Sequence, residues 1–151
     1  MKYVPLGQSE TLRKGKDVAI IAIGKMVNYA LKAAEILAKE DISTEVVNAR
    51  FVKPLDKQML DEIAIKFKYI ITVEDGQKQG GFGSAILEYF AEMNYKQNKI
   101  LVHGIPDSFV QHGTQAELLR DLKLDSDGIA YKVNEFLGNK PIVKKKELVV
   151  N

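Results

Sequence analysis

Short apolar runs alternate with stretches of helical apolar spacing along most of this chain. Four runs rich in Val and Ile predict buried strands, over residues 17–23, 44–48, 69–73 and 99–105. Apolar residues spaced along one face predict helices over residues 26–40, 56–67, 83–93 and 125–137, and a short helix after Thr114. Strands that alternate with helices in this way are typical of a parallel sheet covered on both faces.

Capping signals support two of these helices. Asp56 fits an N-cap, with Pro54 just before it. Thr114, with Glu117 three residues later, has the form of a capping box. The helix over residues 125–137 is expected to open at Asp125.

Residues 9–13 do not fit the alternation. They precede a turn-like stretch, residues 14–17, and predict a short antiparallel edge strand joined to strand 17–23 by a hairpin. The expected fold class is therefore α/β, a three-layer α/β/α arrangement around a mostly parallel five-stranded sheet with one antiparallel edge strand. Residues 4–137 are expected to form one domain, and residues 138–151 a C-terminal tail with a possible short final strand.

Composition excludes several function classes. The 151 residues are 46% hydrophobic and contain no cysteine, which excludes disulfides, thiolate metal sites and a cysteine nucleophile. The net charge is only +2, and the one dense basic cluster, residues 144–146, is interpreted as a solvated tail, so we expect no nucleic-acid partner. No apolar run reaches the roughly 18–20 residues of a membrane span, so we expect no membrane partner either.

The glycine-rich stretch GGFGSA, residues 80–85, lies between a predicted strand and a predicted helix. A helix start attracts anions, which favours a phosphate site. The spacing fits neither the dinucleotide fingerprint nor the P-loop, and Glu74 and Asp75 would repel a phosphate beside them. We interpret the glycines as serving a tight turn and close helix packing. The packing or interface candidates are Glu74, Asp75, Gly80, Gly81, Phe82, Gly83 and Ser84.

Other candidate chemistry is sparse. Glu74 and Asp75 follow a strand, where ligands of such sheets bind, but we interpret them as an exposed, solvating pair. His103 and His112 lie nine residues apart without a third ligand, so no metal site is expected. The sequence predicts no catalytic, cofactor-binding or metal-binding residue.

Several short motifs occur together in one order: NARFVKPLD at residues 48–56, VEDG at 73–76, GGFGSA at 80–85, GIPD at 104–107, HGT at 112–114 and LDSDGI at 124–129. Together they resemble the C-terminal domain of the 1-deoxy-D-xylulose-5-phosphate synthases, which are transketolase-like thiamine-diphosphate enzymes. The likeness covers about residues 4–137. Transketolases and pyruvate dehydrogenase β subunits share the domain more loosely.

The resemblance implies a larger, cytoplasmic and homodimeric parent enzyme, a transferase. It would join pyruvate to glyceraldehyde 3-phosphate with loss of CO₂, for isoprenoid and thiamine biosynthesis, using thiamine diphosphate and Mg²⁺. In the family the cofactor ligands lie in the preceding domains, so we expect this fragment alone to hold no cofactor and to be inactive.

The expected role is packing against other domains of the parent chain and assembly of the dimer. Two alternatives remain open at this point. One is the C-terminal domain of another transketolase-like enzyme or of a 2-oxoacid dehydrogenase β subunit. The other is a standalone anion-binding α/β module that uses the free N–H groups of helix 83–93.

Overall fold

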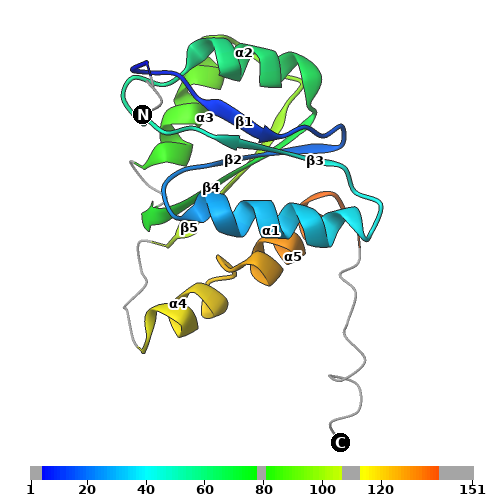
Figure 1. Ribbon diagram of the computed structural model, residues 1–151. Coiled ribbons are helices and arrows are strands. Elements are labelled where there is room, and N and C mark those ends of the chain that lie inside the picture. The colour runs from blue at the N-terminus through cyan, green and yellow to red at the C-terminus, as the bar shows by residue number, and fades with distance from the viewer. Residues whose placement is uncertain (1–4, 78–80, 107–112, 140–151) are drawn as a thin grey trace, which may run out of the picture.

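The computed structural model describes residues 5–77, 81–106 and 113–139, which form one five-stranded sheet between two layers of helices (Figure 1). The strands are β1 (Glu10–Arg13), β2 (Val18–Ala22), β3 (Thr44–Asn48), β4 (Tyr69–Gln77) and β5 (Lys99–Ile105). The helices are α1 (Met26–Ala38), α2 (Lys57–Lys66), α3 (Phe82–Glu92), α4 (Gln115–Asp121) and α5 (Ser126–Phe136). The expected α/β/α fold class is confirmed.

The strand order is β1-β3-β2-β4-β5, with β1 antiparallel to β3 and all other pairs parallel. The predicted edge strand therefore exists, but the predicted hairpin with residues 17–23 is wrong. Both sides of β2 are taken by β3 and β4, so β1 pairs with the outer edge of β3 instead. The turn at Gly15 lies against β3, where an added Cβ would come within 2.2 Å of the Thr44 carbonyl carbon.

Two apolar clusters fill the spaces on either side of the sheet. One joins the sheet to α1 and α5, and includes Leu37 and Ile129. The other joins it to α2 and α3, and includes Leu60 and Ile86. All five residues of β2 are buried because this central strand is covered on both faces.

The helix starts follow the capping chemistry read from the sequence. The side chains of Asp56, Thr114 and Asp125 accept backbone N–H bonds at 3.1, 3.2 and 2.8 Å, from the residues three positions later. Most predicted bounds agree within two residues, but β4 continues to Gln77, four residues beyond the predicted strand end. The tail predicted from residue 138 lies almost wholly outside the described residues.

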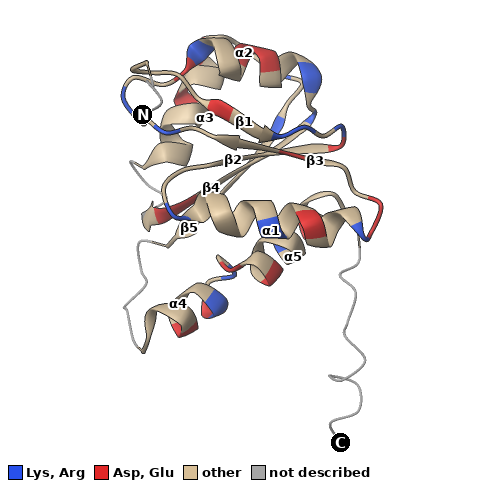
Figure 2. Cartoon of the chain, viewed as in Figure 1, with Lys and Arg blue, Asp and Glu red and all other residues tan. Residues whose placement is uncertain are grey.

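The surface helices carry both signs of charge. Figure 2 shows acidic and basic residues interspersed along α1, α2 and α4. Mixed charge of this kind is typical of a solvated surface. Among the described residues, no helix is both long and apolar enough to cross a membrane.

Candidate functional site

The junction between β4 and α3 places most of the predicted site residues together. Glu74, near the end of β4, is only 3% exposed, and its Oε2 accepts a 2.7 Å hydrogen bond from the backbone N–H of Gly83. α3 has no side-chain cap of its own, since its N-cap residue is Gly81. Glu74 therefore supplies from a neighbouring strand the acceptor that a helix start requires. The interpretation of Glu74 as a solvating residue was wrong.

The environment of Glu74 acts on its charge in two directions. Burial raises the pKa of this carboxyl group above its usual range, and the nearby Asp75 adds to the rise. Backbone hydrogen bonds from Gly83 and Phe82 act in the opposite direction because they favour the ionised form, but burial outweighs them. Its other oxygen, Oε1, is buried without a hydrogen-bond partner among the described residues.

Gly83 lies where α3 comes closest to the sheet. A Cβ added at this position would lie 2.5 Å from Val102 Cγ1 and 2.6 Å from Thr72 Oγ1. Both distances are too short for a real contact, so any larger residue would push α3 away from β4 and β5. The absence of a side chain at Gly83 thus permits both the close packing and the short bond to Glu74.

The other candidates at the junction differ in exposure. Phe82 is 3% exposed and packs in the cluster beneath α2 and α3, while Ser84 is half-buried in the first turn of α3. Gly81 is the N-cap, and its carbonyl accepts the Ala85 N–H at 3.2 Å. Gly80 lies outside the described residues.

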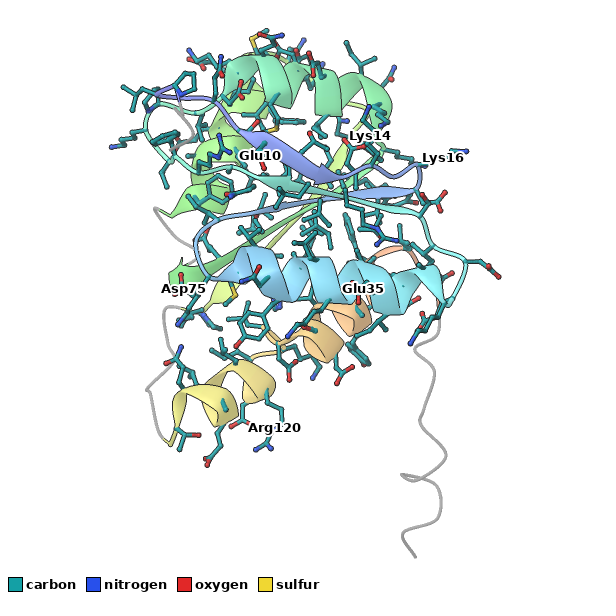
Figure 3. The ribbon with its side chains drawn as sticks, in the orientation of Figure 1. Glu10, Lys14, Lys16, Glu35, Asp75 and Arg120 are labelled. Atoms are coloured by element: carbon teal, nitrogen blue, oxygen red, sulfur yellow. The ribbon has the colours of Figure 1, made fainter. Side chains whose placement is uncertain are left out.

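Asp75 lies at the place where such a sheet usually binds ligands. The strand order reverses between β2 and β4, and ligands of open α/β sheets bind beyond the strand ends at this point. There Asp75 pairs with Lys25 at 3.4 Å, and both side chains are nearly half-exposed. Figure 3 labels Asp75 at the end of the sheet, close to the start of α1. Asp75 is thus exposed as expected, but it is paired with a cation.

The hydrogen bond between Gly83 and Glu74 argues against a phosphate site in the glycine-rich stretch. A phosphate at the start of α3 would need the backbone N–H groups that already point at the Glu74 carboxylate. It would also have to displace or neutralise that buried acid. The junction therefore favours an internal carboxylate cap over a phosphate cradle.

His103 is buried against a backbone carbonyl group. His103 is 3% exposed, and its Nε2 lies 2.6 Å from the Lys123 carbonyl oxygen. Because a carbonyl oxygen can only accept, this nitrogen carries the proton. His112 lies outside the described residues. Within the described part of the chain, no group of three or more His, Asp or Glu side chains could hold a metal ion.

One polar cluster was not predicted from the sequence. Asp61 of α2 accepts hydrogen bonds from the hydroxyls of Tyr89 at 2.6 Å and Tyr95 at 2.7 Å. The bond from Tyr89 is the main cause that lowers the pKa of Asp61, and the same bond raises the pKa of Tyr89 to about 12. Asp61 lies 28 positions from Tyr89 and 34 positions from Tyr95, so no local sequence pattern indicates this cluster.

Known proteins resemble this chain over most of its length. Residues 7–129 match the family model described as transketolase, C-terminal domain. A 1-deoxy-D-xylulose-5-phosphate synthase of Geobacillus sp. (strain WCH70) is 43% identical over 140 residues. The 1-deoxy-D-xylulose-5-phosphate synthase 1 of Geobacter sulfurreducens is 46% identical over 140 residues. Each match covers 93% of this chain but only 22% of the relative, so the chain spans a minor part of these proteins.

Solved structures show the same fold. A split-gene transketolase, described as an inactive beta4 tetramer, matches with a TM-score of 0.82 and 33% identity, over 93% of this chain and 45% of that one. A transketolase mutant from Pichia stipitis matches with a TM-score of 0.65 and 19% identity, over 87% of this chain and 18% of that one, which supports the fold alone. These matches confirm the resemblance predicted from the sequence motifs.

Proposed function

Because the chain belongs to the transketolase C-terminal domain family, we propose that it is the C-terminal domain of a 1-deoxy-D-xylulose-5-phosphate synthase. The relatives named above carry this activity in their names, and their identity to the chain extends over nearly all of it. Those names favour a synthase over a 2-oxoacid dehydrogenase β subunit.

The proposed parent is a transferase that joins pyruvate to glyceraldehyde 3-phosphate. The carboxyl group of pyruvate leaves as CO₂, and its two remaining carbons add to the aldehyde to give 1-deoxy-D-xylulose 5-phosphate. Thiamine diphosphate supplies the electron sink for this decarboxylation when bound, and Mg²⁺ accompanies its diphosphate. A homodimeric parent and a cytoplasmic location belong to the same proposal.

The residues that the structure describes do not fit the cofactor. A diphosphate with Mg²⁺ needs oxygen ligands for the metal and donors for the phosphates. The described residues offer no cluster of metal ligands, and Glu74 already accepts from the start of α3. We therefore assign cofactor binding to the preceding domains of the parent and no step of the reaction to this chain, which alone is expected to be inactive.

The role we assign to this domain is packing and assembly within the parent. The observation that carries it is the β4–α3 junction, where Glu74 accepts the N–H of Gly83 and the missing side chain at Gly83 lets α3 pack closely against the sheet. The outer surface near α3 is partly apolar: Leu87 is 43% exposed and Met93 is 45% exposed. Contiguous exposed apolar patches are typical of surfaces that pack against another domain or subunit, and we infer that these two side chains belong to such a patch.

Two titrations test this assignment. We expect thiamine diphosphate with Mg²⁺, titrated calorimetrically into the isolated chain, to give no saturable heat, whereas the full-length synthase binds both. Inorganic phosphate should likewise give none. Saturable binding of the cofactor to the chain would overturn the placement of the cofactor site, and saturable phosphate binding would favour the anion-binding module instead.

An activity assay tests the parent reaction separately. The full-length protein should form 1-deoxy-D-xylulose 5-phosphate from pyruvate and glyceraldehyde 3-phosphate, and the 151-residue chain should form none. A full-length protein that binds thiamine diphosphate but uses only other donor and acceptor sugars would place it with the transketolases.

A further inference from the structure

The segment over residues 48–56 contacts the first described residues of the chain. Arg50 forms an ion pair with Glu10 of β1, which lies opposite Asn48 in the antiparallel pairing of β1 and β3. Figure 3 labels Glu10 on β1, the edge strand of the sheet. We call residues 5–13 the entry segment, because the chain reaches the sheet through them.

Asp56 binds the entry segment and α2 at the same time. Its Oδ1 accepts the Met59 N–H at 3.1 Å and so caps α2. Its Oδ2 accepts both the backbone N–H and the hydroxyl of Ser9, each at 2.8 Å. Burial raises the pKa of Asp56, but the hydrogen bonds from Ser9 and Met59 outweigh it and lower the pKa overall, which keeps this carboxylate ionised.

The backbone geometry of residues 48–56 and of the entry segment fits these contacts. Arg50 has a left-handed φ of 65°, which a bulky residue rarely adopts, and its N–H donates to the Asn48 side chain at 3.1 Å. Gly7 also has a positive φ, 78°, and a Cβ added there would lie 3.0 Å from Pro54 Cγ. The entry segment therefore turns directly against residues 48–56.

We propose that Arg50 and Asp56 are positioning residues that clamp the entry segment onto the domain. By holding residues 7–10 they set the direction in which the preceding polypeptide leaves the domain. The statement about direction rests on the proposed function, because the preceding polypeptide is then the preceding domain of the synthase. The clamp thus binds a segment of the same chain. It does so through the ion pair of Arg50 with Glu10 and through the Asp56 carboxylate, which accepts from both Ser9 and α2.

The substitution Asp56→Asn removes an acceptor from the contact with Ser9 and leaves the cap of α2 in place. Asparagine caps helices as well as aspartate does, so α2 keeps its acceptor. The amide NH₂ group, however, then faces Ser9 in place of Oδ2, and it cannot accept the hydrogen bond from the Ser9 backbone N–H; the hydroxyl can only be retained by accepting from the amide. Asp125→Asn is the matched control, because Asp125 caps α5 through a 2.8 Å bond from the Gly128 N–H.

Hydrogen exchange of the 151-residue chain gives the first readout. In Asp56→Asn, the amides of residues 9–13 should exchange about tenfold faster than in the wild type, while those of α2 keep their rates. Asp125→Asn should leave residues 9–13 unchanged. Ser9→Ala, which removes only the hydroxyl, should give a smaller increase even if Asp56→Asn folds poorly. Exchange within twofold of the wild type in both clamp variants would overturn the proposal.

Distances in the full-length synthase give the second readout. A spin label at Glu35→Cys, an exposed position on α1, is paired with a second label in the preceding domain. Asp56→Asn should broaden the distribution of distances between the two labels, and Asp125→Asn should not. Faster exchange with an unchanged distribution would show that the clamp holds the entry segment without orienting the preceding domain. A full-length protein without synthase activity would leave the exchange result standing and overturn only the proposed function.

Discussion

The carboxylate of Glu74 accepts a 2.7 Å hydrogen bond from the backbone N–H of Gly83, nine residues later in the chain. This single bond joins the end of β4 to the start of α3 and places a buried acid where an anionic ligand would otherwise sit. In this domain Gly83 thus serves the contact between β4 and α3.

Replacing Glu74 should change how stability depends on pH. Its pKa is raised in the folded protein, so the protonated form is favoured by folding. The contribution of Glu74 is therefore greatest below the unfolded value of 4.5 and declines as the pH rises through the higher folded pKa. In urea titrations, the stability of the wild type relative to Glu74→Gln should increase as the pH falls from 7 toward 4.5.

Glu74→Ala gives the corresponding truncation at fixed pH. It leaves the buried Gly83 N–H without its acceptor and should cost about 1–3 kcal/mol of unfolding free energy at pH 7. In the pH series, the stability of the wild type could instead fall relative to Glu74→Gln on acidification, as it would for a carboxylate of lowered pKa. That result would contradict this account of Glu74.

Gly83→Ala should destabilise the domain because the added methyl group meets Val102 at 2.5 Å. The expected cost is about 1–3 kcal/mol, which is typical of overpacking. Gly76→Ala is the matched control at the same junction, since nothing lies within 4 Å of a Cβ at Gly76, and it should change stability by less than about 0.5 kcal/mol. Equal denaturation midpoints for the two variants would mean that α3 does not need its close approach.

The Asp61 cluster predicts a late-titrating tyrosine. The hydrogen bond to Asp61 raises the pKa of Tyr89 to about 12, from its usual value of 10.0. Tyr89 therefore contributes stability that is complete below pH 10 and is lost as the pH rises through about 12. In an ultraviolet titration, Asp61→Asn should shift this phenol toward 10, because the amide carries no charge. An unchanged titration curve would argue against the bond.

Local signals predicted much of this fold. The Val- and Ile-rich runs gave β2, β3 and β5 nearly to the residue, and Asp56 and Thr114 cap the helices that follow them. These features depend on neighbours a few positions away, so the sequence carries them directly. The parallel sheet followed from the alternation of strands and helices.

The predictions that were wrong, for Glu74 and for the partner of β1, depend on contacts between residues far apart in the sequence. An acid after a strand looks solvating, and nothing local indicates that the N–H of Gly83 will point at Glu74. The partner of β1 was missed for the same reason, since it depends on which edge of the sheet stays open after β4 pairs with β2. Likewise, the bond between Ser9 and Asp56 spans 47 positions.

Gly83→Val in the full-length synthase tests most directly whether this domain serves assembly. The larger side chain should displace α3, and sedimentation should show a dimer that dissociates at higher protein concentration than the wild type. The kcat of the remaining dimer should stay near the wild-type value, as it should in the Gly76→Ala control. An intact dimer that has lost turnover would contradict the account, because it would place this junction in the chemistry of the enzyme.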